Sequence, residues 1–269
     1  MPMKKPIALI LSLCLLLTPI LPALAAEMSE LNATDAFSAK VKRVMTIMPP
    51  SDYATHRYCV QQGAATDGTY AYFVLENQDQ GLGSIWKVSL ADWRVVDCAF
   101  ELPIDHGNDM TYNPNTGLLV VVHNKPNYDT ISMVDPQTLT VVDSRVLPYR
   151  MYGIAYSAER DQYAIGLSGS YDMVILDGEF NEVARYSGVD SGLVRQGMDC
   201  DENFIYFAQN SEDDLVNVIM AYDWSGQFVT QVKVKNMQEI EAMFHVGSDY
   251  YLAFHSGGTY LYRITLNRE

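Results

Sequence analysis

Five short segments organise this sequence: Gln62-Gly63-Ala64-Ala65-Thr66, Asn108-Asp109-Met110-Thr111-Tyr112, Tyr152-Gly153-Ile154-Ala155-Tyr156, Gln196-Gly197-Met198-Asp199-Cys200 and Ile240-Glu241-Ala242-Met243-Phe244. We call these segments the openers, because each begins one unit of a repeat. Their second residues lie at positions 63, 109, 153, 197 and 241, which gives steps of 46, 44, 44 and 44 residues. A period of this size is typical of one four-stranded blade of a β-propeller.

The residues between openers have the pattern of short strands. Each opener is followed by a tight turn and a second β-prone run, namely AYFVL (71–75), LLVVV (118–122), QYAIG (162–166), FIYFA (204–208) and YYLAF (250–254). A third run follows in every unit. In four units a turn such as DPQT (135–138) or DGEF (177–180) leads to a fourth run. Asp, Pro and Gly at these positions favour β-turns, so the sequence predicts four strands per unit.

The fifth unit ends after its third run, at Glu269. An open ring would leave an unpaired strand edge, which proteins avoid. Residues 40–48 (KVKRVMTIM) form a strand-like run before the first opener and can supply the missing outer strand. The prediction is therefore an all-β protein with a single five-bladed propeller, opened near residues 61, 107, 151, 195 and 239. A solenoid is the alternative, but it would require capping repeats and would leave residues 40–48 without a role.

The N-terminal 26 residues have the pattern of a secretory signal peptide. Lys4 and Lys5 precede an apolar run, and Ala23-Leu24-Ala25 fits the small-residue cleavage rule. We therefore expect residues 27–39 to be a linker, residues 40–269 to be the domain, and the protein to be secreted or held in the cell envelope of a bacterium, with no membrane span. A lipoprotein site at Cys14 is a weaker alternative, because bulky Leu13 precedes it.

The three cysteines that remain after cleavage do not form a disulfide framework. Cys59 and Cys98 could pair, although their spacing does not demand it, and Cys200 lies in an apolar β pattern where a thiol usually fills space.

The net charge of the chain limits the classes of partner that it can bind. The formal net charge is −15, and loss of Lys4 and Lys5 would make it −17. Such a surface repels phosphate backbones, so we expect no nucleic-acid partner. We expect a monomer that binds a small polar molecule, a peptide or a glycan.

The starts of the inner strands and the ends of the second strands should surround one mouth of the central channel, which we call the top mouth. The candidate ligand-binding residues there are Gln62, His106, Asn108, Asp109, Arg150, Tyr152, Arg195, Gln196, His123, Asn124, Gln209, Asn210 and His255. Amides, imidazoles and guanidiniums in one pocket suit a polar ligand that makes hydrogen bonds in several directions. The alternative is that a channel mouth is polar because water fills it.

Two carboxylates complete the candidate site. Glu239 and Glu241 alternate by two, so a strand would project both to the same side, where they could share a proton or bind a cation. Ion pairs with Arg195 or Arg150 are an equal alternative. His106, His123 and His255 lack the spacing of a metal motif, so we expect no metal site and no cofactor.

The openers resemble those of the five-bladed glutaminyl cyclases of plant and bacterial type and, more loosely, helveticin-like exported propellers. The resemblance rests on Gln62-Gly63, Gln196-Gly197 and Gln238-Glu239-Ile240-Glu241, while the second and third openers depart from it. It implies an enzyme that closes an N-terminal glutamine to pyroglutamate, with Glu241 or Glu239 as the proton shuttle. Shared architecture without shared chemistry favours a binding protein, with the cyclase as the alternative.

Overall fold

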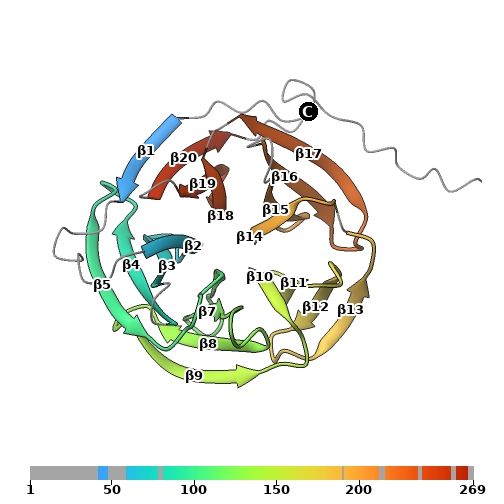
Figure 1. Ribbon diagram of the computed structural model, residues 1–269, viewed down its shortest axis with the longest axis horizontal. Helices are drawn as coiled ribbons and strands as arrows, with labels where there is room; N and C mark the ends of the chain where they lie inside the picture. The colour runs from blue at the N-terminus through green and yellow to red at the C-terminus, as the bar shows by residue number, and fades with distance from the viewer. Residues whose placement is uncertain are drawn as a thin grey trace, which may run out of the picture.

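The computed structural model describes residues 42–47, 59–77, 81–189, 191–211, 216–235, 238–255 and 259–265. These ranges contain the twenty strands β1 to β20, which form five four-stranded antiparallel sheets. The sheets surround a central axis as the blades of a five-bladed β-propeller (Figure 1). The fold predicted from the repeat is confirmed.

In blades 1 to 4 the strands follow the chain from the axis outwards. Blade 1 consists of β2 (Cys59–Thr66), β3 (Tyr70–Asn77), β4 (Leu82–Ser89) and β5 (Val95–Leu102). Blade 2 consists of β6 (Asp109–Asn113), β7 (Leu118–Val122), β8 (Thr130–Asp135) and β9 (Thr140–Val146). Blade 3 consists of β10 (Met151–Ser157), β11 (Gln162–Leu167), β12 (Met173–Asp177) and β13 (Glu182–Tyr186). Blade 4 consists of β14 (Val194–Cys200), β15 (Phe204–Asn210), β16 (Val216–Asp223) and β17 (Phe228–Lys235).

Blade 5 is completed by both ends of the described chain. It consists of β18 (Glu239–Val246), β19 (Asp249–His255), β20 (Thr259–Thr265) and β1 (Lys42–Ile47). β1 runs antiparallel to β20, with Lys42 opposite Arg263 and Ile47 opposite Thr259. The expectation that an N-terminal strand closes the last blade is confirmed, and the pairing covers the outer edge of β20.

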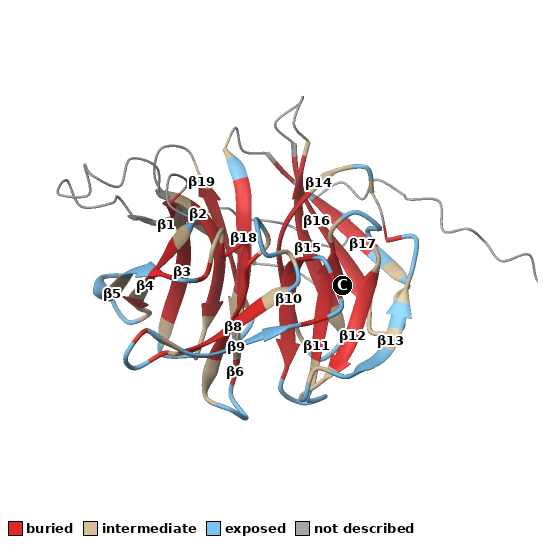
Figure 2. Ribbon diagram, turned by 60° about the horizontal axis from the view of Figure 1, so that its bottom comes forward, coloured by how far each residue is buried: buried red, intermediate tan, exposed pale blue. Residues whose placement is uncertain are grey.

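The core lies between neighbouring blades, because inner strands send side chains to both sides. On β18, Ile240 and Met243 pack in a cluster with blade 4, while Ala242 and Phe244 pack in a cluster with blade 1. The inner strands are accordingly buried, and the outer strands β5, β9 and β13 are largely exposed, whereas the outer strand β17 is mostly buried (Figure 2). Cys200 is a buried free thiol, as expected for a residue that fills space. Cys98 is also a free thiol, whereas the side chain of Cys59 lies outside the described residues.

Tyrosine hydroxyls tie the blades together at the end of the ring opposite the top mouth. Asp201, in the turn after β14, accepts hydrogen bonds from Tyr206 of its own blade at 2.7 Å and from Tyr250 of blade 5 at 2.8 Å. Asn113 of blade 2 donates to the hydroxyl of Tyr163 in blade 3 at 2.6 Å. Many of the aromatic residues therefore stabilise blade contacts. Within the described ranges, no helix is long and apolar enough to cross a membrane.

Candidate functional site

The second residue of each opener lies at the axis. In three blades the ladder between the first two strands shifts register around this residue, as between Ile240 and Ala242, which leaves Glu241 outside the regular pairing. In blade 3 the shift lies one residue earlier, at Tyr152. A β-bulge of this kind re-aims one side chain. The axial positions are therefore occupied by Gly63, Asp109, Gly153, Gly197 and Glu241.

Asp109 closes the axis. Its side chain is wholly buried, and its Oδ2 atom accepts hydrogen bonds from the backbone N–H of Ile154 and of Met198, both at 2.9 Å. Burial raises the pKa of Asp109 well above its ordinary value, although the N–H groups act in the opposite direction and the charge of Asp199 adds to the rise. One carboxyl group thus joins blades 2, 3 and 4.

Glycine is required around Asp109 because the inner strands approach too closely for a side chain. A Cβ atom at Gly63 would lie 2.5 Å from the Cα of Asp109, and one at Gly197 would lie 2.9 Å from the backbone oxygen of Glu241. Such contacts are shorter than packed atoms allow, so the glycines of the openers serve packing at the axis.

The channel opens into a pocket of about 680 Å³ at the top mouth. The residues that line it come from the starts of inner strands and from top loops, chiefly in blades 3 and 4: Asn124, Tyr152, Ser168, Tyr171, Gly192, Leu193, Val194, Arg195, Asn210 and Ser211. A volume of this size is typical of pockets that bind small molecules. The pocket is the principal candidate site.

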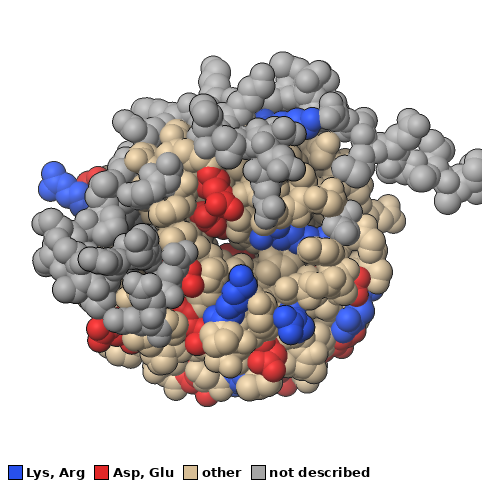
Figure 3. All heavy atoms as spheres, viewed as in Figure 1, with Lys and Arg blue, Asp and Glu red and all other residues tan. Residues whose placement is uncertain are grey.

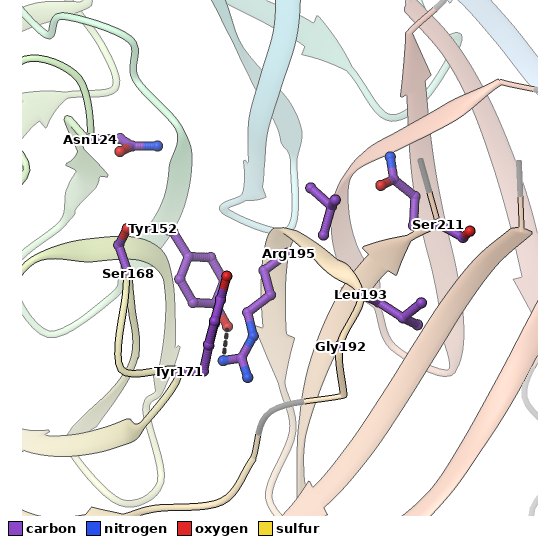
Figure 4. Close-up of a pocket in the computed structure, with 10 residues that line it drawn as sticks. Asn124, Tyr152, Ser168, Tyr171, Gly192, Leu193, Arg195 and Ser211 are labelled. Carbon is purple, nitrogen blue, oxygen red and sulfur yellow. Dashed lines mark hydrogen bonds between the residues drawn. The ribbon is translucent and has the colours of Figure 1, made fainter. Parts of the chain in front are cut away.

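Arg195 is the charged centre of this pocket and is 7% exposed. Its Nη1 donates to the hydroxyl of Tyr152 at 3.1 Å and its Nη2 to the carbonyl of Val189 at 2.6 Å. The guanidinium also lies 4.5 Å from the ring centroid of Tyr171 and 5.4 Å from that of Tyr152 (Figure 4). Hydrogen bonds and cation–π contacts together hold the cation in one position at the pocket wall.

A chain of hydrogen bonds fixes the orientation of two amide side chains in residues that line the pocket. Asn108 Nδ2 donates to the carbonyl of Tyr152 at 2.5 Å, so its Oδ1 accepts from Asn124 Nδ2 at 2.6 Å. Asn210 Nδ2 donates to a carboxylate oxygen of Glu239 at 2.8 Å. These acceptors determine the orientation of both terminal amides. The oxygens of Asn124 and Asn210 are therefore buried hydrogen-bond acceptors, and neither has a partner in the described part of the chain.

The acidic side of the mouth is centred on β18. Glu239 is exposed and accepts from Gln196 Nε2 and from Asn210 Nδ2, each at 2.8 Å. Glu241 is 4% exposed; burial, followed by the charges of Glu239 and Glu76, raises its pKa well above the ordinary value. At the central hollow, acidic atoms lie over β18 and basic atoms over β14 (Figure 3). The top mouth thus has an acidic side and a basic side.

The histidines predicted at this mouth each have a local partner. His106 Nδ1 lies 2.7 Å from a carboxylate oxygen of Glu76, and His255 Nδ1 accepts from the backbone N–H of Gln61 at 3.4 Å. Burial lowers the pKa of His255, with Glu239 acting in the opposite direction. Among the described residues, no group of His, Cys, Asp and Glu side chains has the arrangement of a metal site.

His123 belongs to a buried network inside blade 2. Its Nδ1 lies 2.7 Å from Asp105 Oδ2, and its Nε2 lies 2.7 Å from the hydroxyl of Ser132. These distances are those of a Ser-His-Asp triad. Ser132 is wholly buried, however, and its hydroxyl also bonds to Ser144 at 2.8 Å. The hydroxyl cannot reach a substrate there, so the network serves the fold of blade 2.

Of the predicted residues, the structure brings Asn124, Tyr152, Arg195 and Asn210 together in the pocket wall. Asn108 and Glu239 contact that wall through the hydrogen bonds above, and Gln196 is hydrogen-bonded to Glu239. Others lie behind it or beside it: Gln62, Asp109, His106, His123, Arg150, Gln209 and His255. Asp109 is the largest departure from expectation, because it bonds to the backbone at the axis instead of facing the mouth. Arg150 is exposed and lies 4.0 Å above the ring of Tyr128.

Sequence reasoning missed the loop between β11 and β12, which contributes Ser168 and Tyr171. The segment SGSYD (168–172) occupies the same place in its unit as HNKPNYD (123–129) does in blade 2. Its place in the repeat was the signal that could have found it. Its short length made it resemble a plain turn.

Comparisons with known proteins show the fold alone. No family model matches the chain, and no curated protein matches it. A solved structure of Kuenenia stuttgartiensis hydrazine synthase is 15% identical, with a TM-score of 0.46; the match covers 74% of this chain and 56% of that one. A Bacteroides caccae protein of unknown function is also 15% identical, with a TM-score of 0.50, over 70% of this chain and 72% of that one. This chain thus spans little more than half of the hydrazine synthase chain.

Proposed function

We propose that the top mouth binds a small polar molecule and that the domain is a binding protein. The observation that carries this proposal is the pair of buried amide oxygens, Asn124 Oδ1 and Asn210 Oδ1, in residues that line one pocket. A buried acceptor without a partner costs about 1–3 kcal/mol, so native proteins keep few of them. A ligand that donates hydrogen bonds to both oxygens would offset this cost.

The remaining pocket groups support the same function. Ser168 and Ser211 bring hydroxyls, Arg195 brings a fixed cation, and the ring of Tyr171 is 39% exposed. A few polar groups around an aromatic surface are the usual composition of a site that binds and orients a small molecule. We further propose that the protein acts as an exported monomer, on the basis of the signal-peptide pattern in residues 1–26.

Thermal melts with a panel of compounds test this proposal. Free amino acids and short peptides, mono- and oligosaccharides, and nucleosides would each be added at millimolar concentration. We expect one class to raise the melting temperature, since a ligand that binds only the folded state stabilises it. Asn210→Leu should lose that shift, whereas Gln137→Leu, which changes an exposed amide in the turn between β8 and β9, should keep it. Equal shifts in the two variants would refute the proposed pocket.

A glutaminyl-cyclase-like activity is the second candidate, and Glu241 is the observation that favours it. Burial raises the pKa of this carboxyl, which suits a group that relays a proton. Such an enzyme would release ammonia from a peptide that begins with glutamine. Glu241→Gln would then abolish turnover and leave peptide affinity nearly unchanged, because the relay acts in the transition state. We expect no ammonia from the wild-type protein, as befits a binding protein.

A further inference from the structure

Charged groups of opposite sign lie on two neighbouring inner strands at the top mouth, β14 and β18. Arg195 lies in the pocket wall on β14. Glu239, on β18, contacts that wall through Asn210, whose Nδ2 lies 2.8 Å from the Glu239 carboxylate. Basic and acidic atoms accordingly lie over these two strands at the central hollow (Figure 3).

The acidic side is built to receive hydrogen-bond donors. Asn210 is 6% exposed, and its unpartnered Oδ1 belongs to the same amide whose nitrogen is used by Glu239. An ammonium group has three donors and no acceptor, so it can satisfy a carboxylate and an amide oxygen together.

The basic side is built to receive an acceptor with a planar anionic group. Tyr152 and Val189 hold the Arg195 guanidinium by hydrogen bonds, and the ring of Tyr171 lies 4.5 Å from it. A guanidinium fixed in this way recognises carboxylates well, because its N–H groups match the two oxygens of the carboxylate.

We propose that the ligand is a zwitterionic peptide or free amino acid, with its ammonium group against Glu239 and Asn210 and its carboxylate against Arg195. This inference rests on the proposed binding function and names the ligand class for the same pocket. A volume of about 680 Å³ accommodates a short peptide. Specificity arises because a ligand that lacks either charged end loses the hydrogen bonds which that end would make.

Three forms of one peptide test the proposal: trialanine, N-acetyl-trialanine, which lacks the ammonium group, and trialanine amide, which lacks the carboxylate. Affinities would be measured by isothermal titration calorimetry on the full chain. We expect trialanine to bind at least tenfold more tightly than either blocked form. Equal affinities for all three peptides would overturn the proposal.

Two variants assign each end of the peptide to a side of the pocket. Glu239→Gln should remove the preference for trialanine over N-acetyl-trialanine and keep the preference over the amide. Arg195→Gln should do the reverse, and Arg195→Lys should restore part of the lost preference because the charge returns. Arg94→Gln, which changes a highly exposed arginine far from the pocket, is the matched control and should change neither preference. If Arg195→Gln does not fold, Arg195→Lys and Glu239→Gln still decide the orientation.

The binding results distinguish a failure of the zwitterion proposal from a failure of the proposed binding function. Binding of a saccharide or nucleoside at the Asn210 pocket, with no binding of any peptide or amino acid, would keep the proposed function and refute the zwitterion. No binding of any compound would refute the proposed function itself.

Discussion

The two ends of the central channel are formed by the same five inner strands, yet they differ in pocket volume and in whether their buried polar atoms have hydrogen-bond partners. The top mouth holds a pocket of about 680 Å³, whereas the opposite mouth, which we call the bottom mouth, holds one of about 80 Å³. At the bottom, Asp199 Oδ2 lies 2.8 Å from His245 Nδ1. Among the described residues, the buried side-chain atoms without partners include Asn124 Oδ1 and Asn210 Oδ1 at the top, and none belongs to a residue that lines the bottom pocket.

This difference distinguishes polar groups that stabilise the fold from polar groups that are candidates for ligand binding. Polar groups whose hydrogen bonds are satisfied within the chain stabilise the fold, whereas buried polar groups without partners reduce stability. The bottom of the ring therefore stabilises the structure, and the top holds the candidate site. Three substitutions test this division, from the largest expected effect to the smallest.

Asp201→Ala should produce the largest loss of stability. Asp201 accepts hydrogen bonds from the hydroxyls of Tyr206 and Tyr250 and from the backbone N–H of Asn203 and Phe204. We expect the free energy of unfolding to fall by about 3 kcal/mol in chemical denaturation, because several buried donors lose a charged acceptor. Asp177→Ala, in an exposed turn without tyrosine partners, is the control and should cost less.

The contribution of Asp201 should also depend on pH. Burial alone would raise its pKa, but the hydrogen bonds, led by that of Tyr206, hold the pKa below its ordinary value. A carboxyl with a lowered pKa stabilises the fold above its unfolded-state value, and this stabilisation disappears as the pH falls through the folded-state value. The difference between the wild-type protein and Asp201→Ala should therefore shrink in acid. A constant difference down to the acid transition would contradict the role given to this residue.

Asp109, between the two mouths, should show an intermediate effect that depends on the replacement. Asp109→Ala leaves the N–H groups of Ile154 and Met198 without their acceptor, and we expect a loss of about 2 kcal/mol in denaturant unfolding. Asp109→Asn keeps an oxygen that can accept both bonds, so it should cost clearly less. If both variants lose the same stability, the axial carboxyl does not act through these hydrogen bonds.

Glu241→Gln should produce the smallest change in stability, and this change should be a gain. Because burial raises the pKa of Glu241, the wild-type fold keeps its full stability below the ordinary glutamate pKa and loses some as the pH rises through the folded-state value. The variant should match the wild-type protein at pH 4 and be more stable than it at pH 8. Thermal melts at the two pH values measure this gain, with Glu202→Gln in an exposed turn as the control. If the variant gains no stability at pH 8, ionisation of the buried Glu241 does not destabilise the wild-type fold.

The fold could be predicted from the sequence because the same strand pattern occurs five times. Five openers at nearly constant spacing indicate five blades even if one unit is read poorly, and the run at residues 40–48 was the natural candidate for the missing strand. The structure adds that the second residue of each opener lies at the axis. This explains why glycine occupies three of these positions, since Gly63, Gly153 and Gly197 leave no room for a side chain.

The site was harder to predict, because it depends on which way single side chains turn. Asp109 and Asn108 are neighbours in the sequence, yet one bonds to the backbone at the axis and the other belongs to the amide chain at the mouth. Glu239 and Glu241 were expected to face the same side, but the bulge at Glu241 separates an exposed carboxylate from a buried one. Side chains no longer alternate regularly between the two faces of a strand at a β-bulge, and the sequence spacing does not indicate where that bulge lies.

The pairing of β1 with β20 has a consequence for how the molecule assembles. Lys42 and Arg263 meet in one ladder, so the contact that completes the ring joins residues from the two ends of the described chain. The other blades form from consecutive strands, whose partners are close in sequence. Contacts between distant residues form slowly, because the intervening chain must first be ordered. We expect blades 1 to 4 to assemble early and the fifth blade to close last, which makes ring closure the step that determines the folding rate.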